Sequence, residues 1–392
     1  MKHFLRGGKA QLAVWAAFFS NGAAMATWVS RLPSIQNKLG LSEGSLGLVL
    51  LGSSMGTITA LLLAGNIIEK LGSSKVTLIS ALVLCGSLPL LSLAPDAVLL
   101  FFLLFFFGGA MSLMDVAMNE QAVLVERKTQ LSLMSTFHGG FSIGAMAGAM
   151  IGAGMATLPS NSLVLHFALA AVLFSAINIS IFPYFLPAKS EHHEKRRTIR
   201  IPERALWALG VIAFCSMITE GAMGDWSAIY LTNILQTSSS YAALGYAVFS
   251  LMMTIGRFGG DSITSKWGMV GVIRTGSLIA TTGLVAIILT HSPTIAIMGF
   301  GLVGLGVANV IPLVYKAAGN SPGIPTGTGI AGVASIGYVG SLIGPPLMGA
   351  IAEKASLRAS FTLIAILIST LTVTASSISR HGRNETKIQE DN

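Results

Sequence analysis

Long apolar runs recur along the 392 residues of the chain, and short segments that hold most of its charges separate them. Residues 46–68 and 99–114 are two such runs, each near the roughly 20 residues that a helix needs to cross about 30 Å of hydrocarbon. The pattern predicts an all-α membrane protein with twelve transmembrane helices. We place these helices at residues 10–31, 45–68, 75–94, 97–123, 132–156, 163–186, 206–231, 241–262, 270–290, 294–317, 328–352 and 359–378.

The basic residues are unevenly distributed between the ends of these spans. With the N-terminus in the cytoplasm, 20 of the 24 Lys and Arg fall in inner segments or at inner span ends. The exceptions are Arg31, Lys38, Lys354 and Arg358. Because inner loops of membrane proteins are rich in Lys and Arg, the chain is predicted to be a multi-pass protein of a bacterial inner membrane with both termini cytoplasmic.

Short segments recur at an offset of about half the chain. Residues 25–28 match residues 223–226 at an offset of 198, and residues 67–72 match residues 263–268 at an offset of 196. Such matches predict duplicated six-helix bundles in the same orientation, with a solute site between them. The expected divisions are an N-terminal bundle at 1–187, a cytoplasmic linker at 188–205, a C-terminal bundle at 206–378 and a cytoplasmic tail at 379–392.

Glycines follow a four-residue spacing along the predicted fifth span, at positions 140, 144, 148 and 152. Gly144 and Gly148 recur as Gly340 and Gly344 at the offset of 196. Small residues let membrane helices approach one another closely. The stripe is therefore predicted to pack against a neighbouring helix.

Composition excludes several classes of protein. Hydrophobic residues make up 53% of the chain and charged residues 10%, and the mean hydropathy is +0.73, which is too apolar for a soluble domain. The net charge is +8, but the basic residues are scattered between the spans and form no patch interleaved with aromatic residues, so no nucleic-acid partner is expected. Cys85 and Cys215 stand apart, and neither a disulfide, a metal nor another cofactor is expected. The chain has no GxxxxGK[ST] or HExxH motif, so neither an ATP-driven pump nor an enzyme is predicted.

Two matching loops point to a family. Residues 65–75 read GNIIEKLGSSK, and residues 256–268 read GRFGGDSITSKWG. The pair resembles the signature that follows the second helix in the major facilitator superfamily (MFS), which implies the MFS fold of two pseudo-symmetric six-helix bundles. The resemblance further implies cytoplasmic gating loops that stabilise one access state, with a purely topological role of the lysines as the alternative. The residues concerned are Gly65, Glu69, Lys70, Gly72, Arg257, Asp261, Lys266 and Gly268.

A narrower resemblance covers most of the chain and links it to bacterial fucose-permease-like facilitators, mostly of unassigned substrate. The segments that carry it are residues 28–33, 115–119, 137–138, 225–226, 309–312 and 337–346. The resemblance implies transport without naming a solute. Drug antiporters of the superfamily carry a Gly-Pro pair in the fifth helix, whereas this chain has no proline between Gly144 and Met150.

Few polar groups lie within the predicted spans, where an ionisable side chain is costly and usually functional. Asp115 and Asn119 share one helix face and are predicted to bind solute or a proton, or to make a helix–helix contact. His138 and Glu220 are candidate proton carriers, with a structural histidine and a fixed ion pair as the alternatives. Asn309 and Tyr315 flank the expected break at Pro312 and could line the pathway.

Arg31 and Asp225 lie near repeat-related ends of the first and seventh spans, beside Trp28 and Trp226. We expect these four residues to form an outer gate in which the two charges pair. The alternative is a set of unrelated interfacial residues.

Together these features predict a secondary active transporter that moves a small solute by alternating access and is coupled to protons. The alternatives are a drug or metabolite efflux antiporter and a membrane sensor that no longer transports. We expect a monomer surrounded by membrane lipid.

Overall fold

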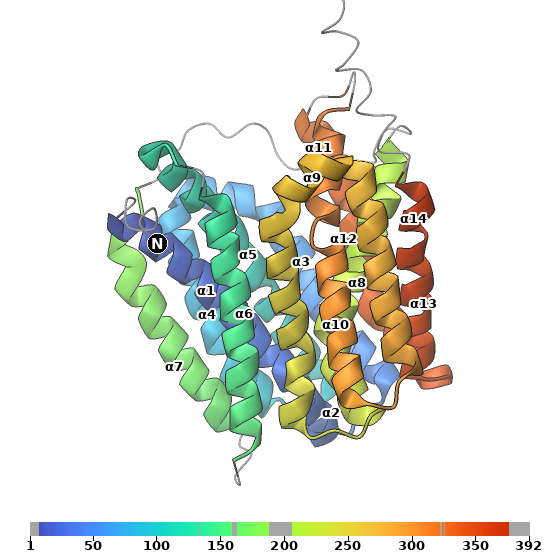
Figure 1. Cartoon of the computed structure of the whole chain (residues 1–392). Coiled ribbons are helices and arrows are strands. Elements are labelled where there is room, and N and C mark those ends of the chain that lie inside the picture. The colour runs from blue at the N-terminus through green and yellow to red at the C-terminus, as the bar shows by residue number, and fades with distance from the viewer. Residues whose placement is uncertain are drawn as a thin grey trace, which may run out of the picture. The chain divides into compact units, whose positions relative to one another are not determined.

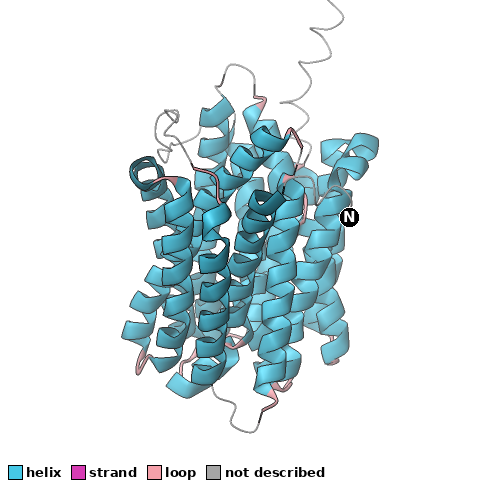
Figure 2. Cartoon of the chain, turned by 90° about the vertical axis from the view of Figure 1, so that its left-hand side faces the viewer, coloured by secondary structure: helices cyan, strands magenta, loops and turns pink. Residues whose placement is uncertain are grey.

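The computed structural model describes residues 8–131, 133–158, 163–187, 206–321, 324 and 326–375. Within these residues every regular element is a helix (Figure 2). The predicted linker 188–205 and tail 379–392 lie outside the described residues. The helices are α1 (Gly8–Ser30), α2 (Leu32–Leu39), α3 (Glu43–Leu71), α4 (Ser73–Leu93), α5 (Ala97–Thr129), α6 (Met134–Ala156), α7 (Leu163–Ile181), the short 3₁₀-helix η1 (Phe182–Tyr184), α8 (Trp207–Asn233), α9 (Ser239–Leu289), α10 (Pro293–Val307), α11 (Val310–Gly319), α12 (Thr326–Lys354), α13 (Leu357–Ser369) and α14 (Leu371–Thr374) (Figure 1).

Twelve segments of the described chain are helical, long and apolar enough to cross a membrane, which confirms the predicted number. Helix α9 carries two of them, Ser239–Gly260 and Ser262–Leu289, whereas α10 and α11 together form one, Pro293–Gly319. Helix α2 is absent from the predicted set, although the local signals are present: proline lies in its first turn, and Gly40 ends it with φ 60°. Glycine adopts this left-handed conformation without steric cost.

The contacts divide the chain into two compact units. The first comprises Met1–Arg196 and Ala228–Ala247, and the second comprises Arg197–Ser227 and Val248–Asn392. The end of α8 and the start of α9 therefore belong to the first unit. These two units are defined by contacts and alternate along the chain, so they do not test the boundaries predicted for the two bundles. Those boundaries stay a prediction.

The glycine stripe of α6 packs against α1, as predicted. A Cβ added at Gly144 would clash with the carbonyl oxygen of Phe19, and one added at Gly148 would clash with that of Ala23. In the second unit, a Cβ at Gly340 of α12 would lie 2.7 Å from the carbonyl oxygen of Phe214 on α8. The absence of side chains at these positions is what allows the helix backbones to approach so closely.

The internal repeat also appears in other contacts. A Cβ at Gly108 of α5 would clash with the carbonyl oxygen of Ser53 on α3, and one at Gly304 of α10 would clash with that of Phe249 on α9. Both members of the second pair lie 196 residues after those of the first. The sequence repeat is thus a repeat of helix pairs.

The turns repeat at the same offset as well. Gly72, between α3 and α4, has φ 80°, and Gly268, at the kink inside α9, has φ 68°. Both backbone conformations favour glycine over residues with a side chain. The corresponding turns of the two halves therefore depend on the same residue type.

Candidate functional site

The backbone of the tenth span is broken between α10 and α11. Ala308 and Asn309 separate the two helices, four and three residues before Pro312. Proline has no N–H to donate to the carbonyl four residues earlier, and its ring crowds that carbonyl. The break therefore leaves the carbonyl of Ala308 available to another donor. Arg257 of α9 supplies it, with 3.4 Å between its Nε and the Ala308 oxygen.

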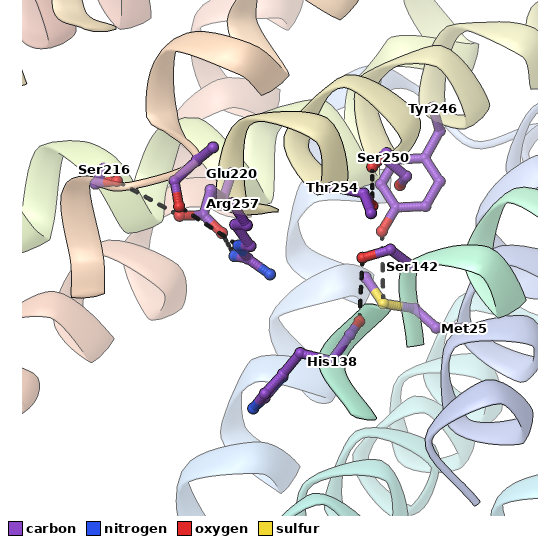
Figure 3. Close-up of polar contacts among 10 residues, drawn as sticks. Met25, His138, Ser142, Ser216, Glu220, Tyr246, Ser250, Thr254 and Arg257 are labelled. Atoms are coloured by element: carbon purple, nitrogen blue, oxygen red, sulfur yellow. Dashed lines mark hydrogen bonds and ion pairs between the residues drawn. The ribbon is translucent and has the colours of Figure 1, made fainter. Parts of the chain in front are cut away.

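Arg257 also faces a carboxylate on α8. Its Nη2 lies 3.8 Å from Oε2 of Glu220, and the Ser216 hydroxyl donates to Oε1 of Glu220 across 3.4 Å. Figure 3 shows these side chains pointing toward one another. The side chains of Arg257 and Glu220 are 34% and 28% exposed, so the pair is only partly shielded from its surroundings. A partly exposed pair at this distance is weak enough to open and close.

The approach of α9 to the break depends on two glycines. The amide of Asn309 donates to the carbonyl oxygen of Gly256 across 2.9 Å, and a Cβ at Gly260 would clash with Oδ1 of Asn309. A Cβ at Gly256 would lie 2.7 Å from Cβ of Ala308. Asn309, a predicted pathway residue, thus fixes α9 beside the break, and Tyr315 lies part-buried one turn beyond Pro312 on α11.

Asp115 and Asn119 of α5 share one helix face, as their spacing predicted, and hydrogen-bond to each other. The Asn119 amide donates to the Asp115 carbonyl oxygen across 2.8 Å and to its Oδ1 across 3.1 Å. Asp115 is exposed and lies nine residues after Phe106, which is 60% exposed. At about 100° per residue the two side chains leave α5 on opposite sides. The polar pair therefore occupies the face of α5 opposite its exposed aromatic face.

His138 lies in the second turn of α6 and contacts α1. Its ring meets that of Phe18 edge-on, with 5.1 Å between the centroids. Its carbonyl oxygen accepts a hydrogen bond from the Ser142 hydroxyl (Figure 3). The start of α6 is capped by Glu126 of α5, whose Oε1 accepts from the backbone N–H groups of Leu133 and Met134. This cap, which joins α5 to α6, was not among the sequence predictions.

The predicted outer-gate residues are buried or part-buried in separate units. Arg31 is fully buried at the α1–α2 junction, and its burial lowers the pKa of its guanidinium; Trp28 is 4% exposed. Both belong to the first unit, whereas Asp225 and the fully buried Trp226 belong to the second. The pairing of Arg31 with Asp225 stays a prediction.

The predicted gating loops are mostly helical. Gly65, Glu69 and Lys70 all lie in α3, and a single residue, Gly72, separates α3 from α4. In the second copy, Lys266 and Gly268 lie in α9, as does the backbone of Asp261. Arg257 lies inside the candidate span Ser239–Gly260, where it contacts Glu220 and the break rather than a loop. The gating roles themselves stay predictions.

Comparisons with known proteins decide the family. Residues 14–327 match the Major Facilitator Superfamily. An uncharacterised MFS-type transporter of Yersinia pestis is 37% identical over 376 residues, which cover 94% of this chain and 96% of the relative. The membrane protein MosC of Rhizobium meliloti is 31% identical, over 90% of this chain and 86% of MosC. The chain belongs to the Major Facilitator Superfamily.

Solved structures of this facilitator family share its fold. The nucleoside transporter NupG matches with a TM-score of 0.73 at 13% identity, covering 95% of this chain and 99% of NupG. The fucose:proton symporter FucP of E. coli matches with a TM-score of 0.62 at 16% identity, covering 94% and 98%. The predicted fold and family are confirmed. This facilitator is a multi-pass membrane protein that transports small solutes, and like other members it is neither an enzyme nor dependent on a cofactor.

One further polar contact of this facilitator was not predicted. The amide of Asn233, the last residue of α8, lies 3.3 Å from Oε1 of Gln36 and 3.2 Å from Oε1 of Glu43. All three residues belong to the first unit. No motif marks Asn233, and an uncharged amide at a helix end gives no signal that distinguishes it from a capping residue.

Proposed function

We propose that this facilitator couples the movement of a small polar solute to that of protons, and that the Glu220–Arg257 pair is the coupling site. The observation that carries the proposal is an ion pair placed within the helices of a membrane-spanning unit, 3.8 Å apart and partly exposed. Ionised Glu220 attracts Arg257, whereas protonated Glu220 loses this attraction. Proton binding would thereby free Arg257 and the break that it contacts.

The solute is assigned to a different group of residues. Asp115 and Asn119 form an exposed polar patch on a face of α5 that lies opposite its exposed aromatic side. A polar patch at membrane depth is favourable only beside protein or water. We assign this face to the solute pathway, with His138 as a second proton carrier. FucP, which shares the fold, is a fucose:proton symporter, and its activity is consistent with this class of transport.

The proposed mechanism is alternating access. The two bundles would expose the solute site to each side of the membrane in turn. Pairing of Arg31 with Asp225 would close the outer mouth in one of the two access states.

A ligand must be found before coupling can be measured. Purified protein is screened by thermal shift against a library of metabolites and drugs, with Asp115→Asn screened in parallel. A ligand that raises the unfolding temperature of the native protein but not of the variant names the solute and supports its site. Stabilisation by amphipathic drugs alone would favour an efflux antiporter instead.

Two flux measurements in proteoliposomes then separate coupling from solute movement. Counterflow exchanges labelled for unlabelled solute and needs no ion gradient, whereas accumulation under an imposed pH gradient does. We expect Glu220→Gln to retain counterflow and to lose at least 90% of pH-driven accumulation. A loss of 90% is a tenfold effect, which corresponds to about 1.4 kcal/mol. Native flux that is indifferent to the pH gradient would rule out proton coupling.

The proposed orientation places both termini in the cytoplasm of a bacterial inner membrane. The two native cysteines are buried, so a single introduced cysteine can report its own side. Lys354→Cys is expected to react with an impermeant maleimide in intact spheroplasts. Lys128→Cys is expected to react only after lysis. The reverse pattern would invert the proposed topology.

A further inference from the structure

An apolar groove runs along the outside of the first unit, where α3, α4 and α5 meet. Its volume is about 240 Å³. Its wall includes Gly56, Ala60 and Ile67 of α3, Ile79 of α4, and Gly109 and Leu113 of α5. Gly56 and Ile67 are eleven residues apart, so the groove follows α3 for about 16 Å. This length and volume suit a flexible chain rather than a compact ligand.

The wall of the groove offers almost no polar partner. Its two hydroxyl groups bond within their own helices, Thr59 to the carbonyl oxygen of Met55 and Ser80 to that of Val76, both at no more than 2.8 Å. Sites for small polar solutes have a few converging polar groups that fix orientation. Hydrocarbon is therefore the chemistry that this wall can accept.

The hollow exists because small residues replace large ones. Gly56 and Gly109 lie where α3 and α5 approach most closely, and Ala60 and Ala110 continue the floor. The surrounding surface is apolar and exposed, including Phe106 at 60%. In a membrane protein such a surface contacts lipid, so an acyl chain can enter the groove from the side.

Two positive charges stand at one end of the groove. Lys70 follows the wall residue Ile67 by three positions on α3, and Lys75 precedes the wall residue Ile79 by four on α4. These spacings put both lysines on the helix faces that form the groove. Both are exposed, whereas Glu69 leaves α3 about 200° away from Ile67. We therefore expect the two ammonium groups at this end of the groove, on helix faces that the Glu69 carboxylate does not share.

We propose that this groove binds an anionic phospholipid, with one acyl chain between α3, α4 and α5 and the headgroup phosphate at Lys70 and Lys75. Basic groups beside a membrane helix attract anionic headgroups, and the apolar groove holds the chain in register with them. The lipid thereby connects the α3–α4 turn at Gly72 to α5. This site is separate from the polar groups assigned to solute and proton.

Native mass spectrometry of the delipidated full chain in detergent tests the proposal. The probes are phosphatidylglycerol and phosphatidylcholine with the same long acyl chains. Each lysine beside an anionic lipid contributes roughly fivefold, so we expect the native protein to prefer phosphatidylglycerol by roughly 30-fold. The double variant Lys70→Gln with Lys75→Gln is expected to bind both lipids equally. Lys128→Gln, a matched charge change near the end of α5, is expected to keep the preference.

Binding of the acyl chain in the groove is tested separately from the role of the two lysines. Ala60→Trp fills the groove and is expected to weaken binding of both long-chain lipids at least tenfold. Ala176→Trp, on an exposed part of α7, is the matched control and is expected to bind as the native protein does. Unchanged gel-filtration profiles and unfolding temperatures establish that each variant is folded. A variant that fails this check is replaced by the smaller change Ala60→Leu.

Three results would overturn the proposal. The first is a preference for phosphatidylglycerol that survives loss of both lysines. The second is native-like lipid binding by the folded groove-filling variant. The third is binding of six-carbon phosphatidylglycerol as tightly as the long-chain lipid, or displacement of the long-chain lipid by millimolar inorganic phosphate. Either outcome would show a phosphate site that does not bind an acyl chain.

Discussion

One repeat-related pair of glycines, Gly148 and Gly344, meets different surfaces in the two halves of this facilitator. In the first half, a Cβ at Gly148 of α6 would clash with the carbonyl oxygen of Ala23, which belongs to the α1 backbone. In the second half, a Cβ at the repeat-related Gly344 of α12 would lie 3.2 Å from Cγ1 of Ile218, a side-chain atom of α8. Backbone cannot move aside without shifting a helix, whereas a side chain can adjust. The difference is confined to this position, because the repeat-related pair one turn earlier, Gly144 and Gly340, meets a backbone carbonyl oxygen in both halves.

The polar groups differ between the halves as well. The described residues of the second half hold the Glu220–Arg257 pair and the interrupted helix at Ala308. In the first half, Asn119 bonds to Asp115 within a continuous α5. The second half thus combines a partly exposed ion pair with an interrupted helix, whereas the polar pair of the first half lies on a continuous helix.

The largest expected effect separates the Gly148 position from the Gly344 position. Gly148→Ala forces α1 and α6 apart, and overpacking of this kind typically costs about 1–3 kcal/mol. Gly344→Ala needs only a small movement of Ile218 and gains the higher helix propensity of alanine, so we expect a change below about 1 kcal/mol. The measurement is the thermal unfolding temperature in detergent.

Each half carries its own reporter for that measurement. Cys85 belongs to the first unit and Cys215 to the second, and both are buried. A thiol-reactive dye applied to Cys215→Ser reports the first unit alone, and applied to Cys85→Ser it reports the second. Equal losses from Gly148→Ala and Gly344→Ala would contradict the difference between the two positions.

The next effect concerns the ion pair of the second half. Arg257→Met removes the cation that faces Glu220, keeps the Ser216 contact and frees the Ala308 carbonyl, and we expect a loss of about 1 kcal/mol because the pair is partly exposed. The double variant with Glu220→Gln should lose less than the sum of the single losses. A double-mutant cycle on unfolding temperature measures this coupling. Strict additivity would mean that the two side chains do not interact.

A smaller effect is expected from Pro312→Ala, which restores an N–H group that can bond the Ala308 carbonyl. Arg257 would then no longer be the needed donor, so Arg257→Met should cost about 0.5 kcal/mol less in this background. The check is a comparison of Arg257→Met in the two backgrounds by the Cys215 reporter. An unchanged cost would show that the bond from Arg257 Nε to Ala308 contributes nothing.

The smallest expected effect on stability lies in the first half. Asn119→Ala removes hydrogen bonds at an accessible position on α5, and we expect a loss of no more than about 0.5 kcal/mol. Counterflow of the identified solute should nevertheless fall at least tenfold if the patch lines the pathway. Normal counterflow with normal stability would leave Asn119 outside the pathway.

Much of the architecture could be read from the sequence because it depends on features that are local or periodic. The length of the apolar runs indicated the twelve spans, and the repeated loop motif included Gly72 and Gly268, both of which have a positive φ in the structure. The four-residue spacing of glycine in α6 predicted a packing seam, since residues at this spacing share one helix face. The spacing of Asp115 and Asn119 placed them on one face of α5 for the same reason.

The partners of most functional side chains could not be read in this way. Arg257 belonged to a motif that suggested a loop, yet it contacts Glu220, 37 positions away, and a carbonyl freed by Pro312. Its role depends on which helix lies beside it. The contact of Asn233 with Gln36 and Glu43 joins residues about 190 positions apart, and no periodic pattern encodes such a distance.

The sequence by itself therefore determined how often the chain crosses the membrane, where it repeats and which faces are small or polar, because a helix has fixed periodicity and the membrane has a fixed thickness. Only the tertiary structure decided that Gly148 meets backbone whereas Gly344 meets a side chain. It also decided that Glu220 has a cationic partner and that α3, α4 and α5 form an apolar groove. These properties depend on which helices become neighbours, and that choice results from packing over the whole bundle.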